Sequence, residues 1–337
     1  MASHTKLLNK VDPGFFREQL EDRRKHLQDA LDERGHQSQL VDLLQQVDAA
    51  LERIDYGTYG LCKTCQEPIE EERLLADPLL CFCLDHLTEA QQRDLEQDLY
   101  LASRVQGALL PQKEISLGQW SIYYSYLPAG PVSGDYCDLI KLPQEDGQFL
   151  FVLGDVSGKG VSASMLMTHL HAMFRSLIGL QFKVDQLMEK ANRVFCESTL
   201  SSHYATLISG FAKSDGLIEI ANAGHWPSLL FGHNRSEWIG STGIPIGLFC
   251  EAKYQVQTIQ LHPGDTLLLY TDGLIEASNK IIEYGEARLQ GLVASLELRD
   301  PKSLVDACLA DLRKFLNGSA QSDDLTLMAI QWSGSNS

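Results

Sequence analysis

Residues 148–160, QFLFVLGDVSGKG, are the stretch from which the fold of this chain can be read. The run before Gly154 is apolar and is typical of a buried strand. It leads directly into Asp155, which lies in a glycine-rich turn. A carboxylate at a strand end, beside glycines with accessible backbone carbonyls, suits a hard cation that prefers oxygen ligands. On its own the pattern also fits an ordinary turn after a strand.

Three other stretches place acidic residues beside strands. They are SGDYCD with Asp135 and Asp138, YTDG with Asp272, and SDDLTL with Asp323 and Asp324. Carboxylates that are packed together repel one another, and burial raises that cost. Because divalent cations relieve the repulsion, we expect the four stretches to converge on a pair of metal ions. Such a pair commonly serves the hydrolysis of phosphate esters.

In this order, the motifs GDYCD, GDVSGKG, YTDGLIEA and SDDLTL resemble those of the PP2C-like serine phosphatases of the bacterial SpoIIE/RsbU type. The stretches NAGHWPSLL (222–230) and GIPIGL (243–248) fit the resemblance as well. It covers about residues 97–333 and implies a PP2C-like αββα sandwich of two antiparallel sheets flanked by helices. The strand-rich pattern with inserted helices independently indicates an α+β fold.

The resemblance also implies a role for each acid. The metal ligands would be Asp135, Asp138, Asp155, Val156, Asp272, Asp323 and Asp324. Asp155 would bridge two Mn²⁺ or Mg²⁺ ions, with the carbonyl of Val156 on one of them. Asp272 and Asp323 would hold the other ion and, with Asp155, form the catalytic set. Asp135 and Asp138 of SGDYCD would lie on the side of the ion that Val156 contacts. Asp324 would lie behind the direct ligands.

Two departures from eukaryotic PP2C enzymes leave the phosphate binder and the proton donor unassigned. Ser157 stands where those enzymes carry a histidine, and no arginine lies between Val105 and Asp135. Lys159 could contact the phosphate or could be a solvated loop lysine. His225 could be catalytic, although an Asn-Ala-Gly-His loop is more simply explained as a turn.

A second pattern joins Cys62-Lys-Thr-Cys65 to Cys83-Leu-Asp-His86. Two such pairs supply the four nitrogen and sulfur ligands that a tetrahedral structural zinc ion takes. Clustered cysteines in a reducing compartment indicate metal binding rather than disulfides. Cys81 is a competing ligand, but its spacing to Cys83 suits such a site less well.

The run ALERIDYGTYGLCKTCQEPIEEERLLADP resembles the zinc finger of the DksA/TraR family over about residues 40–87. His86 stands where that family usually has its last cysteine. The family acts on RNA polymerase through acidic residues at the tip of a helical hairpin. Asp29 and Asp32 match that tip poorly, so we expect the finger to have a structural or a sensory role.

The composition of the 337-residue chain limits its partners. A net charge of −17 argues against a nucleic-acid surface, which needs clustered lysine and arginine. No apolar run approaches the roughly 20 residues that span a bilayer, and the first residues contain no apolar signal core. We therefore expect a cytoplasmic protein without membrane contact.

The chain is expected to divide into four parts. They are a helical hairpin or coiled coil (1–55), the zinc finger (56–90), a linker or signalling helix (91–111) and the phosphatase domain (112–337). The amino-terminal and linker helices could pair in a homodimer.

The leading hypothesis is a metal-dependent protein serine/threonine phosphatase in bacterial partner-switching signalling. Its substrate would be a phosphorylated regulatory protein, by resemblance a STAS-type anti-sigma-factor antagonist. The alternative is a binding module whose finger recruits RNA polymerase or another partner, with the phosphatase domain as regulated or vestigial output. A third hypothesis is that a zinc- or thiol-sensitive switch is formed by Cys62, Cys65, Cys83 and His86.

Overall fold

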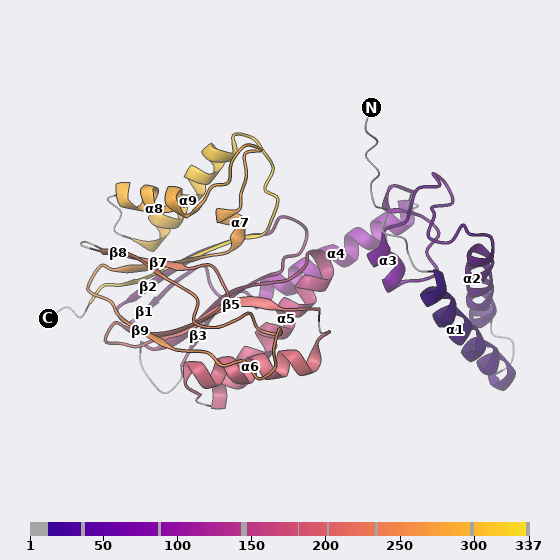
Figure 1. The fold of residues 1–337 in the computed structure, drawn as a ribbon, viewed down its shortest axis with the longest axis horizontal. Coiled ribbons are helices and arrows are strands. Elements are labelled where there is room, and N and C mark those ends of the chain that lie inside the picture. Colours follow the sequence, from indigo (N-terminus) through magenta and orange to yellow (C-terminus); the bar gives the residue numbers. More distant parts are fainter. Residues whose placement is uncertain are drawn as a thin grey trace. The chain divides into compact units, whose positions relative to one another are not determined.

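The computed structural model describes residues 13–34, 38–86, 89–142, 147–180, 182–200, 202–232, 235–296 and 300–334 (Figure 1). The chain forms two compact units, Met1–Gln97 and Asp98–Ser337. No helix in the described ranges combines the length and the apolar character needed to cross a membrane.

The amino-terminal unit begins with two helices that pack against each other, α1 (Pro13–Arg34) and α2 (Ser38–Asp55). Arg17 near the start of α1 pairs with Asp55 at the end of α2, and Arg24 pairs with Asp48 one to two turns further in. The two helices are therefore antiparallel and form a hairpin within one chain. The sequence predicts a break between two helices at Gly35, which lies outside the described residues.

The cysteine-containing segment folds onto this hairpin. It includes the short helix α3 (Glu71–Ala76) and a single 3₁₀ turn (Leu84–His86), and α4 (Glu89–Leu109) follows. One apolar cluster joins the hairpin to the segment, and its buried members are Phe16, Leu20, Leu27, Val47, Ala50, Leu51, Tyr59, Cys62, Ile69, Leu74 and Cys83. Because the thiols belong to the same core as the helices, the hairpin and the cysteine-containing segment form one packed unit.

The carboxy-terminal unit contains two antiparallel sheets. The six-stranded sheet has the order β1 (Glu114–Leu117), β2 (Trp120–Leu127), β11 (Leu325–Trp332), β10 (Thr266–Tyr270), β7 (Ser228–Gly232), β8 (Arg235–Ile239). The five-stranded sheet has the order β3 (Asp135–Lys141), β4 (Phe149–Val156), β5 (Ala205–Ala212), β6 (Leu217–Ala223), β9 (Gln257–Gln260).

Helices cover the outer face of each sheet (Figure 1). The helices α5 (Gly160–Leu177) and α6 (Val184–Ser198) pack on the five-stranded sheet, with a 3₁₀ turn (Ile178–Leu180) after α5. The helices α8 (Glu286–Ser295) and α9 (Pro301–Leu316) share a core with the six-stranded sheet. A separate apolar cluster fills the space between the two sheets. Its largest members include Trp120, Phe149 and Phe151. This confirms the predicted αββα sandwich.

From residue 120 onward the sequence predicts strands at 120–126, 148–154, 204–212, 217–222, 227–231, 254–260, 266–271 and 325–332. It predicts helices at about 161–179, 183–200, 285–296 and 301–317, and the observed elements agree with these ranges to within a few residues. Four elements were not anticipated, namely β1, β3, β8 and the one-turn helix α7 (Asp272–Ile275). Asp135 was expected in a turn, whereas it is the first residue of β3. Short edge strands depend on pairing with a neighbour rather than on their own sequence, so periodicity does not reveal them.

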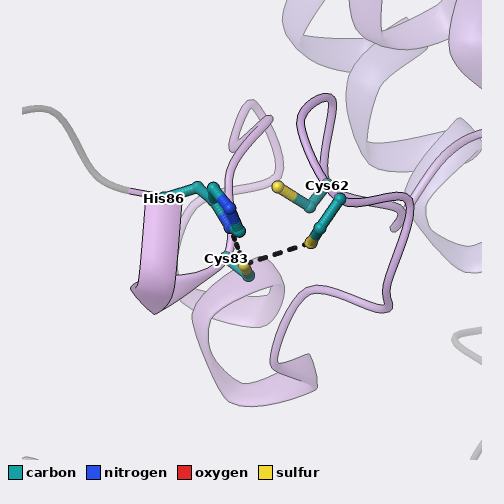
Figure 2. Close-up of side chains that lie close together, drawn as sticks. Cys62, Cys83 and His86 are labelled. Carbon is teal, nitrogen blue, oxygen red and sulfur yellow. Dashed lines mark hydrogen bonds between the residues drawn. The ribbon is translucent and has the colours of Figure 1, made fainter.

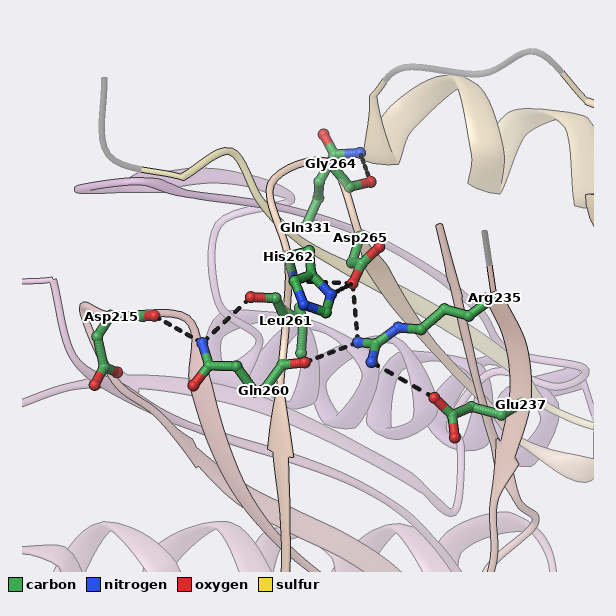
Figure 3. Close-up of polar contacts among 9 residues, drawn as sticks. All are labelled: Asp215, Arg235, Glu237, Gln260, Leu261, His262, Gly264, Asp265 and Gln331. Atoms are coloured by element: carbon green, nitrogen blue, oxygen red, sulfur yellow. Dashed lines mark hydrogen bonds and ion pairs between the residues drawn. The ribbon is translucent and has the colours of Figure 1, made fainter. Parts of the chain in front are cut away.

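A polar network closes one end of the sandwich (Figure 3). Arg235, at the start of β8, pairs with the nearly buried Asp265 just before β10, at 2.9 Å between Nη2 and Oδ2. The same carboxylate accepts a hydrogen bond from the backbone N–H of His262. A Cβ on Gly232 would lie only 1.7 Å from Oδ1 of Asp265, so β7 needs glycine there. Since Asp272 follows the other end of β10, this network is remote from it.

Candidate active site and metal sites

Strand pairing brings the predicted acids to one end of the sandwich. Asp135 on β3 lies directly opposite Asp155 on β4 in the antiparallel register. Asp272 opens α7 one residue after Thr271, beyond the end of β10, and Asp323 lies just before β11. The neighbouring strands β10 and β11 run in opposite directions, so the end of one and the start of the other meet at the same edge.

A cavity of about 370 Å³ opens at this edge. Its lining residues are Asp155, Ser157, Tyr204, Thr206, Gly224, His225, Trp226, Pro227, Asp272 and Glu276. Two of the predicted acids, Asp155 and Asp272, therefore face the same space although they come from different sheets. Asp135 and Asp323 lie nearby but do not line it.

The electrostatics of the cavity favour a bound cation. Burial, followed by the charges of Asp272 and Asp323, raises the pKa of Asp155 to about 8. Burial and the charge of Asp323 likewise raise the pKa of Asp272 to about 6. Carboxylates whose pKa is raised in this way are held without enough positive charge nearby, and a divalent ion would supply it.

Asp135 adds a second observation in favour of a cation. Its Oδ2 accepts hydrogen bonds from the hydroxyls of Thr271 (2.9 Å) and Thr326 (2.5 Å). Its Oδ1 is buried and has no hydrogen-bond partner among the described residues. Burial, together with the charge of Asp155, raises the pKa of this carboxyl well above its usual range. A buried carboxylate oxygen without a donor is the kind of atom that a metal ion or its water satisfies.

Gly134 leaves space beside two of the predicted ligands. A Cβ at this position would lie 3.2 Å from the carbonyl oxygen of Val156 and 3.3 Å from Oδ1 of Asp155. Both oxygens therefore lie next to the space where a Cβ would stand at position 134, which the side chain of any larger residue would occupy. The donor set and this space fit a hard cation with oxygen ligands.

Asp323 and Asp324 differ in what they contact. Asp323 Oδ2 is 2.7 Å from Nζ of Lys159, which also donates to the carbonyl of Ser322. Lys159 does not line the cavity, and its side chain is largely exposed, as expected for a solvated loop lysine, although it pairs with Asp323. The carboxylate of Asp324 accepts from the backbone N–H groups of Ala129 (2.7 Å) and Gly134 (2.8 Å). Asp324 holds the segment before β3, consistent with its expected place behind the direct ligands.

The expectation that Asp138 joins the metal ligands is wrong. Side chains alternate along a strand, so Asp138 points to the opposite face of the sheet from Asp135. There its fully buried carboxylate accepts two hydrogen bonds from Arg175 on α5, at 2.8 and 2.6 Å. Asp138 therefore anchors α5 to β3.

Several cavity residues were not singled out in the sequence. Glu276 lies four residues after Asp272, a spacing that places both on one side of a helical turn and could have indicated it. Thr206 is the pairing partner of Asp155 across β4 and β5. That pairing depends on the sheet register, and no local motif around Thr206 carries it.

The structure also brings the four zinc candidates together. Atoms of Cys62, Cys65, Cys83 and His86 lie within 4.8 Å of one another, the one such group of three or more in the described ranges. The Sγ atoms of Cys65 and Cys83 are 3.7 Å apart, and Nδ1 of His86 is 3.2 Å from Cys83 Sγ (Figure 2). Three thiols and one imidazole at this separation suit tetrahedral zinc.

Cys81 does not belong to this group. Its Sγ accepts a hydrogen bond from Arg53 Nη1 at 3.1 Å and lies 3.4 Å from the carbonyl of Leu79. This position agrees with the expectation that Cys81 suits the zinc site less well than the other four candidates.

Comparison with known proteins identifies the carboxy-terminal unit. The model of the family described as Stage II sporulation protein E (SpoIIE) matches residues 145–333. The chain belongs to the SpoIIE family. Its carboxy-terminal unit has the fold of a solved PP2C domain, as the motifs predicted.

Individual relatives agree with this family. Protein IcfG of Synechocystis sp. is 27% identical over 264 residues, which are 69% of this chain but only 41% of IcfG. The phosphoserine phosphatase RsbU of Bacillus subtilis is 24% identical over 248 residues, 71% of each chain. Among solved structures, the SiaA-PP2C domain of Pseudomonas aeruginosa superimposes with a TM-score of 0.63 at 20% identity. The superposition covers 73% of this chain and all of that domain.

Proposed function

We propose that this SpoIIE-family chain is a metal-dependent protein serine/threonine phosphatase. The observation that carries the proposal is the meeting of Asp155 and Asp272, from two different sheets, in one cavity with their pKa values raised. The similarity to the phosphoserine phosphatase RsbU supports it. The reaction would consume one water and convert a phosphoseryl or phosphothreonyl ester to the free hydroxyl and inorganic phosphate.

We propose Asp135, Asp155, Val156, Asp272 and Asp323 as the residues that hold two Mn²⁺ or Mg²⁺ ions. When bound, such ions offset negative charge and lower the pKa of water. The chain's own contribution is to bury the acids, to hold them by strand pairing, and to keep one side of Asp155 open at Gly134. Asp324 positions the loop before β3 through the backbone of Ala129 and Gly134.

The dimensions of the cavity suit a side chain rather than a folded domain. A volume of about 370 Å³ accommodates a phosphorylated serine or threonine, and the rest of a protein substrate would remain on the surrounding surface. By the family resemblance, we propose that the substrate is a phosphorylated STAS-type anti-sigma-factor antagonist.

Phosphate release tests this function directly. The purified chain with Mn²⁺ should release inorganic phosphate from phosphorylated STAS proteins, and Asp155→Ala or Asp272→Ala should lower the rate by at least about 100-fold. Glu237→Gln is the matched control, because Glu237 is an acid on β8 that pairs with Arg235 away from the cavity. Full activity in either aspartate variant would refute the site assignment.

We further propose that Cys62, Cys65, Cys83 and His86 hold one structural zinc ion in a DksA/TraR-like finger (residues 56–90). The participation of Cys62 and Cys83 in the hydrophobic core of the hairpin supports a stabilising role, since ion binding there would hold the core together. Residues 1–55 would form the hairpin, 91–111 the linker helix and 112–337 the phosphatase domain.

A further inference from the structure

A buried histidine in the cavity lining connects the two sheets. His225 lies in the turn between β6 and β7 and is only 4% exposed. The side chain of the buried Asn222 holds this turn, because its Oδ1 accepts from His225 N–H at 2.7 Å and its Nδ2 donates to the carbonyl of His225. The backbone of His225 is therefore held in place, and the contacts of its two ring nitrogens orient the imidazole.

The two ring nitrogens of His225 contact different sheets. Nε2 is 3.1 Å from the carbonyl oxygen of Tyr270 on β10, and Nδ1 is 2.8 Å from the hydroxyl of Thr206 on β5. A carbonyl oxygen can only accept, so Nε2 carries the proton. Burial lowers the pKa of His225 to about 4, so the ring is neutral near pH 7. Nδ1 is then an acceptor, and the Thr206 hydroxyl donates its proton to it.

This arrangement determines what Thr206 can offer to the cavity. Thr206 lines the cavity and pairs directly with Asp155 across β4 and β5, so the two side chains stand on the same face of the sheet. A hydroxyl has one proton and two acceptor lone pairs. The Thr206 hydroxyl donates its one proton in the hydrogen bond to Nδ1 of His225. The Thr206 oxygen can therefore only accept hydrogen bonds from the other groups beside Asp155.

The reactants of the proposed phosphatase offer one suitable donor. A phosphate ester dianion has no proton to donate, and the carboxylates would have none once they hold metal ions, whereas the attacking water has two. A fixed acceptor beside Asp155 can hold one O–H of that water and so direct its lone pair toward phosphorus.

We propose that Thr206 accepts a hydrogen bond from the attacking water and that His225 is a positioning residue that keeps the Thr206 hydroxyl in the accepting orientation. This inference rests on the proposed phosphatase function. Thr206 keeps its own proton throughout and is neither the base nor the acid. The proton balance of hydrolysis is unchanged, with one hydrogen of the water retained on phosphate and one ending on the leaving seryl oxygen.

The kinetic test uses p-nitrophenyl phosphate with Mn²⁺ and the full chain. Thr206→Val, which keeps the shape of the side chain, should lower kcat by about 10- to 100-fold with little change in KM. Thr206→Ser restores the hydroxyl and should stay within about threefold of wild type. His225→Gln should lower kcat, and the double variant with Thr206→Val should be no slower than the worse single one, because both remove the same interaction.

A spectroscopic test does not depend on activity. In ¹⁵N-histidine-labelled protein, His225 should show a protonated Nε2 and an unprotonated Nδ1, and Thr206→Val should shift the Nδ1 resonance alone. A protonated Nδ1, an unchanged kcat in Thr206→Val, or an equal loss in Thr206→Ser would each overturn the inference. Absence of phosphatase activity in the wild type would instead refute the proposed function, and the resonances would still report the hydrogen-bond direction.

Discussion

Asp135 and Asp155 are direct partners across β3 and β4, and Asp135 is held from the other sheet by the hydroxyls of Thr271 and Thr326. The pair therefore lies where the two sheets meet, with one oxygen of Asp135 buried and without a hydrogen-bond donor in the described part of the chain.

This relationship predicts the effect of Asp135→Asn. The variant keeps the shape of the side chain and removes a charge, so the affinity for Mn²⁺ should fall by about tenfold or more. The metal-free protein should be as stable as wild type or more stable, because a buried acid near Asp155 is replaced by a neutral group. Isothermal titration calorimetry and urea unfolding measure the two effects. Unaltered Mn²⁺ affinity would show that Asp135 does not serve the metal site.

Asp138→Asn is a matched substitution on the same strand with the opposite expectation. It leaves the guanidinium of Arg175 without its carboxylate, and the free energy of unfolding should fall by about 1–3 kcal/mol. The expected loss is smaller than for a fully buried ion pair, because Arg175 is partly exposed to solvent. Mn²⁺ affinity, measured by the same titration, should not change. A large loss of affinity would return Asp138 to the metal site.

The burial of His225 predicts a specific acid sensitivity. Its pKa is about 4 in the folded state against 6.5 for an unperturbed histidine, so the unfolded chain binds a proton more readily. The corresponding stability is fully present above pH 6.5 and is lost as the pH falls toward 4, on the order of 3 kcal/mol in total. Urea unfolding of wild type and His225→Gln at pH 7.5 and pH 4.5 should show a smaller loss in the variant. Equal losses would contradict a neutral, buried His225.

Zinc binding should distinguish His86 from Cys81. Cys65→Ser or His86→Ala should abolish stoichiometric zinc and lower the melting temperature, because the ligands lie against the core of the amino-terminal unit. Cys81→Ser should retain one zinc per chain, since its thiol contacts Arg53 and lies outside the group. Elemental analysis and thermal unfolding check both outcomes. Zinc loss in Cys81→Ser would require a different ligand set.

The proposed homodimer can be tested on α4. Leu101 and Val105 lie one turn apart on this helix and are 51% and 60% exposed, so they form an apolar face that a second copy could cover. Leu101→Glu combined with Val105→Glu should convert a dimer to a monomer in light scattering, because charges would be buried at the interface. A wild-type chain that is monomeric at high concentration would refute the homodimer.

Sequence reasoning succeeded where the signal is local. The apolar run before Gly154 predicted β4, and the paired spacing at Cys62–Cys65 and Cys83–His86 predicted ligands that the fold brings together. It failed at Asp138, which shares a motif with Asp135 but points to the opposite face, because one residue of register decides the side of a strand. It also passed over Glu276, which lies in the quoted motif YTDGLIEA but was given no role there, and Thr206, which lies in none of the quoted motifs.

The sequence by itself determined the strand and helix periodicity, the acidic motifs and the spacing of the zinc candidates, because these depend on residues near one another in the chain. The tertiary structure alone decided which oxygen of Asp135 is free, that Arg175 pairs with Asp138, and that His225 joins Tyr270 to Thr206. Those contacts link residues that are far apart in the chain and on different layers. They exist only once the packing of the core has set the register and spacing of the two sheets.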